Sequence, residues 1–72
     1  MPRSAEVIRQ WNVLRELEAS RRATISGLAQ KMDVTTRTIR RDLEALQVAG
    51  FPIFDELVDG KRFWKLDTKP FR

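Results

Sequence analysis

Apolar residues recur at helical spacing through the first two thirds of the chain and change to a strand-like pattern afterwards. Over residues 4–19, Val7, Trp11, Leu14 and Leu17 follow one another at intervals of four and three, which predicts one face of an amphipathic helix. Two further apolar residues widen this stripe, Ile8 and Val13. We therefore expect Trp11 in the core, because aromatic side chains bury a large apolar area. The solvent side would carry Arg9, Arg15, Glu16 and Glu18.

A second, shorter helix is predicted over residues 26–32, where Leu28, Ala29 and Met32 are apolar. Either Thr24 or Ser26 offers a hydroxyl to cap its start. A helix this short is marginal alone, so it needs packing partners. The next two residues, Asp33 and Val34, form a tight turn, with Val34 as an apolar contact between this helix and the following one.

The third predicted helix spans about residues 35–49, with Thr35 or Thr36 as its cap. Its buried face carries Ile39, Leu43 and Leu46, which recur at intervals of four and three. The helix should end at Gly50, which suits positive φ, and Pro52 prevents its continuation. The opposite face carries Arg37, Arg41 and Glu44, with Thr38 and Arg40 on its flanks.

After residue 50 the pattern favours two β-strands, over residues 51–58 and 61–67, joined by the turn pair Asp59-Gly60. A two-stranded hairpin alone is marginal. We therefore expect it to pack on the helices and to bury Ile53, Leu57 and one or two aromatic rings. Three helices followed by a hairpin predict a mainly α fold, the winged helix-turn-helix. Residues 1–67 would form this domain, and residues 68–72 a linker or tail.

Composition narrows the range of functions. The chain has 72 residues, which suits one domain, and contains no histidine and no cysteine. The usual zinc ligands and the usual catalytic bases are therefore missing, and no glycine-rich phosphate loop occurs. We expect no enzyme activity, no cofactor and no bound metal. No apolar run approaches the roughly 20 residues that a membrane span needs, and the start has no apolar signal core, so we expect a cytoplasmic protein without a membrane partner.

The net charge of +4 suits a polyanionic partner such as double-stranded DNA. The third helix is not a basic block, because residues 33–50 hold three arginines against three acidic residues. Its arginines are positioned at the front of the helix near its N-terminus, where a helix-turn-helix contacts base edges in the major groove. The alternative for this helix alone is an ordinary solvated face.

Three further places in the chain are candidates for contact with DNA phosphates. Arg21 and Arg22 either bind the phosphate backbone or favour the end of the first helix. The hydroxyl of Ser26 lies near a helix start, which suits a phosphate as well as plain capping. At the predicted hairpin tip, Lys61 and Arg62 would contact phosphate or the minor groove, or remain solvated.

The segments ISGLAQKMDV and TRTIRRDLEAL resemble the N-terminal winged helix of the DeoR-type and WYL-domain bacterial transcription regulators. The likeness covers roughly residues 7–66 and includes the Phe51-Pro52-Ile53 start of the wing. Gly27 and the short wing tip DGKR depart from the family's pattern. The resemblance implies a structural role for Asp42, held among its arginine neighbours or at a helix start. Regulators of this kind carry a C-terminal sensing or dimerising domain, through which a homodimer would form. We therefore expect this sequence to be either a fragment of such a regulator or a stand-alone domain.

The resemblance implies that Thr36, Arg37, Thr38, Arg40 and Arg41 face the DNA groove or its phosphates. Together with the candidates above, the residues expected to bind DNA are Thr35, Thr36, Arg37, Thr38, Arg40, Arg41, Ser26, Arg22, Lys61 and Arg62. The expected function is sequence-specific binding of double-stranded DNA by a transcription regulator, with residues 35–49 as recognition helix. The alternative is a winged helix that binds proteins and not DNA, since a fold does not fix a function.

Overall fold

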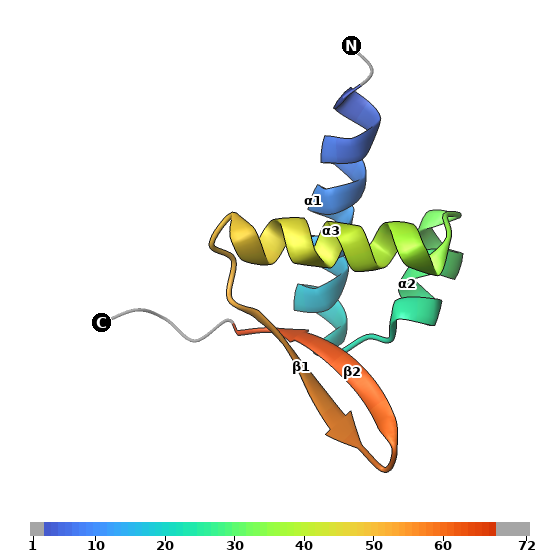
Figure 1. Cartoon of the computed structure of the whole chain (residues 1–72), viewed down its shortest axis with the longest axis vertical. Helices are drawn as coiled ribbons and strands as arrows, with labels where there is room; N and C mark the ends of the chain where they lie inside the picture. Colours follow the sequence, from blue (N-terminus) through green and yellow to red (C-terminus); the bar gives the residue numbers. More distant parts are fainter. Residues whose placement is uncertain (1–2, 68–72) are drawn as a thin grey trace.

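Three helices and an antiparallel hairpin follow one another along the chain, as the sequence predicts. A computed structural model describes residues 3–67, with side chains from residue 5 onward. The elements are α1 (Arg3–Ser20), α2 (Ile25–Met32), α3 (Thr36–Val48), β1 (Ile53–Val58) and β2 (Lys61–Leu66). In Figure 1, α3 crosses in front of α1, while the hairpin projects away from the helices as a wing. The expected winged helix-turn-helix is confirmed.

The helix α1 faces the core with a different stripe from the one expected. Val13, Leu14 and Leu17 are buried, whereas Trp11 is 60% exposed, and Val7 and Ile8 are exposed to a similar degree. The prediction that Trp11 lies in the core is therefore wrong. Stepping back from Leu17 by three, four and seven residues gives Leu14, Val13 and Gln10, so Gln10 is in register with the core and Trp11 is not. In Figure 1 the N-terminal part of α1 extends beyond α3, which leaves this part of the helix without a cover.

The exposed stripe gives a direct test of the corrected register. Replacing Trp11 with alanine should change the free energy of unfolding by less than about 0.5 kcal/mol, because its ring is largely in water. Replacing the buried Leu17 with alanine, as the matched variant on the same helix, should lower it by about 2–5 kcal/mol. Urea unfolding followed by circular dichroism measures both. If Trp11→Ala lowered the free energy of unfolding as much as Leu17→Ala, Trp11 would lie in the core and the corrected register would be wrong.

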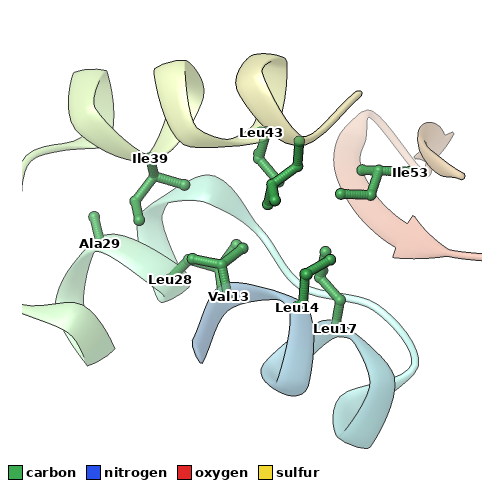
Figure 2. Packing of buried hydrophobic residues seen from close by; sticks show 9 residues of the cluster. Val13, Leu14, Leu17, Leu28, Ala29, Ile39, Leu43 and Ile53 are labelled. Atoms are coloured by element: carbon green, nitrogen blue, oxygen red, sulfur yellow. The ribbon is translucent and has the colours of Figure 1, made fainter. Parts of the chain in front are cut away.

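The core lies where the three helices meet. Figure 2 shows Ile39 and Leu43 of α3 turned toward Leu28 of α2 and Leu17 of α1, and all four side chains are buried. The turn residue Val34 is half-buried and packs on this cluster, as expected. The helix-turn-helix is thus held by one continuous apolar cluster, which fixes the direction of α3 relative to α1 and α2.

Local hydrogen bonds set the ends of α2 and α3. The hydroxyl of Thr24 caps α2 by accepting from the Gly27 amide at 3.0 Å. Between the helices, Asp33 adopts the left-handed conformation, with φ +59°, and ends α2. The Val34 amide then donates to the carbonyl of Ala29 at 3.0 Å, which is a Schellman-type closure. This tight turn leaves only three residues between the end of α2 and the start of α3.

An ion pair joins α1 to α2 at the surface. Lys31 Nζ lies 2.6 Å from Glu16 Oε2, and the Ser20 hydroxyl donates to the same carboxylate at 2.8 Å. The hydrogen bonds from Lys31 and then Ser20 lower the pKa of Glu16 below its ordinary value of 4.5. The pair therefore stabilises the domain at neutral pH, and this contribution is lost as the pH falls below that value.

The hairpin is regular, and its turn has the chemistry that the sequence predicts. Asp59 and Gly60 both have positive φ, +52° and +78°, as a two-residue type I′ turn requires. Ile53 pairs with Leu66 near the helices and is buried. The expectation that Leu57 is covered is wrong, since it is 63% exposed. Leu57 pairs with Arg62 close to the tip, where the hairpin has left the helical body.

A pair of hydrogen bonds ties the wing to the connection between α1 and α2. The Ala23 amide donates to the Trp64 carbonyl at 2.9 Å, and the Trp64 amide donates to the Ala23 carbonyl at 2.7 Å. Residue 23 thereby adds one rung of sheet beside β2, and Trp64 packs against the core. The sequence pattern gave no indication of this bridge, because a single residue shows no periodicity.

The connection between α1 and α2 contains a conformation that favours glycine. Arg21 has φ +70°, in the left-handed region that costs a non-glycine residue about 1–2 kcal/mol. Replacing Arg21 with glycine should relieve this strain. The greater flexibility of glycine in the unfolded chain offsets part of the gain, so the free energy of unfolding should rise by about 0.5–1 kcal/mol. The control is Arg15→Gly, inside α1, which should lower it by about 1 kcal/mol. Thermal and urea unfolding measure both, and a loss in both variants would contradict the assigned backbone conformation.

Candidate nucleic-acid interface

The outward face of α3 is a row of arginines on a helix whose back is buried. Ile39 and Leu43 are fully buried, whereas Arg37, Arg40 and Arg41 are exposed. None of the three arginines makes a hydrogen bond, ion pair or ring contact with a residue in the part of the chain that the structure describes. Their guanidinium groups are therefore available to an external anion or base edge.

The threonines at the start of α3 have different roles. The Thr35 hydroxyl accepts from the Thr38 amide at 3.2 Å and lies 3.1 Å from the Thr38 hydroxyl. Thr35 is therefore the cap, and Thr38 is half-buried beside it. Thr36, the first residue of the helix, is exposed. Free amide groups and positive helix polarity at this end suit a DNA phosphate.

Behind this face, a buried acid anchors α3 to α1. The Asp42 carboxylate is 2% exposed and accepts from Arg9 Nε at 2.5 Å, Arg9 Nη2 at 2.9 Å and Gln10 Nε2 at 3.1 Å. The hydrogen bond that Arg9 donates to the Asp42 carboxylate raises the pKa of Arg9. The structural role expected of Asp42 is confirmed, but its partner is Arg9 rather than a neighbouring arginine on α3. The placement of Arg9 on the solvent side is therefore wrong.

The need for a partner to Asp42 could have been recognised from the sequence. Asp42 lies three residues after Ile39 and directly before Leu43, which puts a carboxylate inside the apolar stripe of α3. A buried charge needs a paired opposite charge. Arg9 directly precedes Gln10, so it lies at the edge of the stripe that α1 buries. With that stripe assigned, Arg9 would be the candidate cation for Asp42.

Two of the phosphate candidates lie around the α1–α2 connection. The guanidinium of Arg22 stacks on the ring of Phe63 in β2, 4.4 Å from its centroid, while the side chain remains exposed. Ser26 is also exposed, and because Thr24 caps α2, its hydroxyl is not used for capping. Ser26 is the second residue of α2, so it stands near the free amide groups of that helix.

The wing residues point in different directions. Lys61 and Arg62 are neighbours in β2, and consecutive residues of a strand face opposite sides of the sheet. Arg62 is half-exposed and forms an ion pair with Asp55 across the hairpin. Lys61 shares its side with Phe63 and Lys65, and Lys65 pairs with Glu56 at 3.2 Å. The structure therefore separates the pair that the sequence grouped at the wing tip.

The arrangement defines a class of protein. A short helix, a tight turn and a second helix with an exposed basic front, followed by a wing, form the winged helix-turn-helix of DNA-binding domains. The sequence profile of the family described as "HTH domain" matches residues 9–56, two thirds of the chain, so the chain belongs to this helix-turn-helix family. No match was found among curated proteins or among solved structures. Within residues 3–67, none of the helices has the length and apolar character required to cross a bilayer.

Proposed function

We propose that this chain binds a specific sequence of double-stranded DNA, with α3 as the recognition helix in the major groove. The observation that carries the proposal is the exposed row of Arg37, Arg40 and Arg41, which have no partner among residues 3–67, on a helix whose back is buried. Arginine presents two parallel donors to the O6 and N7 atoms of guanine, or to a phosphate. Because the core and the ion pair of Asp42 fix the backbone of α3, the ordering that binding requires falls on the exposed arginine side chains and not on the helix itself.

Contacts with the phosphate backbone would come from the surroundings of α3. Thr36 and Ser26 offer hydroxyl groups at helix starts, and Arg22 and Lys61 offer charge from the connection and the wing. Such contacts position the protein and carry no sequence information themselves. Thr35, Thr38 and Arg62 contribute less directly, because their side chains already have partners within the domain.

Binding to a labelled duplex, measured by fluorescence anisotropy at 50 and 200 mM salt, tests this proposal. With about four phosphate contacts, affinity should fall by about 100-fold between the two salt concentrations. A competing duplex of random sequence should displace the protein from its selected site only in excess. A folded chain, checked by circular dichroism, that fails to bind any duplex at 50 mM salt would overturn the proposal.

The finer assignment rests on the resemblance to DeoR-type and WYL-domain regulators. The run Thr38-Ile39-Arg40-Arg41-Asp42-Leu43 supports it, and the burial of Ile39, Asp42 and Leu43 gives that run a structural reason. On this proposal the chain is the DNA-binding part of a cytoplasmic bacterial transcription regulator. A further domain would pair two copies, so that they bind half-sites about one helical turn apart.

The second candidate function is protein binding by the same fold. It is favoured by one observation, the exposed apolar stripe of Val7, Ile8 and Trp11 on α1. The DNA titration distinguishes the two functions, because a module that binds only protein would show no salt-dependent affinity for the duplex. Alanine at Trp11 would then abolish partner binding and leave the fold intact.

A further inference from the structure

An acidic residue stands on the face of α3 that would meet DNA. At about 100° per residue, Glu44 lies within about 60° of Arg37 and Arg41 around the helix axis, and about 140–160° from the buried Ile39 and Leu46. It is exposed. A carboxylate facing a polyanion weakens binding through repulsion, so its position calls for a physical reason.

Neutralisation of the neighbouring arginines does not supply this reason. Arg40 and Arg41 precede Glu44 by four and three residues, which is the spacing of helical ion pairs. Yet Glu44 makes no ion pair or hydrogen bond with any residue in the described range 3–67. The order with arginine before glutamate is also the weaker orientation for such a pair. The carboxylate is therefore free to accept from an external donor.

Glu44 differs from the polar residue one turn further along the helix. Gln47 donates from Nε2 to the carbonyl of Ile53 at 2.9 Å and so holds the start of β1. Its amide is used within the fold, whereas the carboxylate of Glu44 is not. Within the second half of α3, Glu44 is the polar side chain best placed to contact a base.

We infer that Glu44 accepts a hydrogen bond from the N4 amino group of a cytosine and thereby sets the base preference at one position of the site. This inference rests on the proposed DNA-binding function. In the major groove the amino groups of cytosine and adenine are the donors, and carboxylate side chains pair with cytosine N4. A base whose exposed edge offers acceptors, such as guanine, leaves the carboxylate desolvated and unpaired, so Glu44 excludes it.

The spacing along α3 places this cytosine relative to its neighbours. Arg41 and Glu44 are about 4.5 Å apart along the axis, and Arg37 and Arg41 about 6 Å. Base pairs are spaced about 3.4 Å apart. The cytosine should therefore lie one to two base pairs from the guanine contacted by Arg41, on the side away from the Arg37 contact.

Selection of bound sequences from a randomised duplex pool, followed by sequencing, tests this with the full chain. The wild type should favour cytosine at one position by about 5- to 150-fold, the equivalent of about 1–3 kcal/mol for a mismatched base pair. Glu44→Ala should lose the preference at that position alone, and Glu44→Gln should shift it toward adenine, which pairs with an amide. Glu18→Ala, which removes the same charge from an exposed position on α1, should leave every preference unchanged.

The outcomes distinguish failure of the role of Glu44 from failure of DNA binding itself. Retention of the cytosine by Glu44→Ala, with the variant folded by circular dichroism, overturns the role of Glu44 and leaves DNA binding standing. Loss of preference in Glu18→Ala as well overturns it too, because the effect would then follow net charge. Failure of the wild type to bind any duplex overturns the proposed function, and the inference with it.

Discussion

Replacing Asp42 with alanine should lower the free energy of unfolding by about 3 kcal/mol, near the lower end of the range of about 3–5 kcal/mol for a broken buried ion pair. The carboxylate accepts three hydrogen bonds from Arg9 and Gln10 and is almost fully buried. Its loss leaves the Arg9 guanidinium, 22% exposed, without its partner. Because Arg9 can turn partly toward water, the upper end of the range is not expected.

The matched control is Asp55→Ala, which breaks the surface pair with Arg62 on the hairpin. Exposed pairs contribute only about 0–1 kcal/mol, so this variant should stay close to the wild type. Urea unfolding monitored by circular dichroism measures both variants. A domain of this size has only about 4–11 kcal/mol of stability, so Asp42→Ala should be visibly weakened at 37 °C. Equal, small losses in the two variants would show that the Asp42 pair does not hold α3.

The double variant Arg37→Ala/Arg41→Ala should lower affinity for the selected duplex by about 100-fold or more while the fold is kept. Each bidentate contact with guanine contributes about 1–3 kcal/mol of discrimination, and 1.4 kcal/mol corresponds to a factor of ten. Both side chains are exposed and lack partners among residues 3–67, so their removal leaves no buried group unsatisfied. Anisotropy titration at 50 mM salt measures the loss, alongside a duplex of unrelated sequence.

The control for charge is Arg15→Ala/Lys31→Ala, which removes two positive charges from α1 and from the end of α2. This variant should weaken binding only slightly, because neither residue lies on the outward face of α3. If both double variants lose affinity equally, binding depends on net charge, and the assignment of α3 as the recognition helix would be wrong. A larger loss on the selected duplex than on the unrelated one would separate base contacts from phosphate contacts.

The sequence predicted the elements well, because their signals are local. The caps, the spacing of Ile39, Leu43 and Leu46, and the Asp59-Gly60 turn each act over a few residues. Boundaries differ by at most one residue, apart from the predicted start of the hairpin. That start differs by two residues, because Pro52 lacks the amide that would let the strand begin earlier.

Errors arose where two elements had to be fitted together. On α1, two stripes share Leu14 and Leu17, and the one with Trp11 is the more apolar. The structure buries the other stripe, because Gln10 and Arg9 satisfy Asp42 across the interface. Periodicity within one helix does not contain this information. The exposure of Leu57 is likewise not encoded in the strand pattern, because it depends on how far the hairpin extends beyond the helices. The roles of the DNA-facing residues remain predictions.

The hydrogen bonds between Ala23 and Trp64 have a consequence for the way the molecule moves. They close a chain segment that contains α2, α3 and β1, so the hairpin and the α1–α2 connection share a single opening rather than fraying independently. We therefore expect a displacement of the wing to reach the start of α2 through residue 23, because these two hydrogen bonds join the wing to the α1–α2 connection.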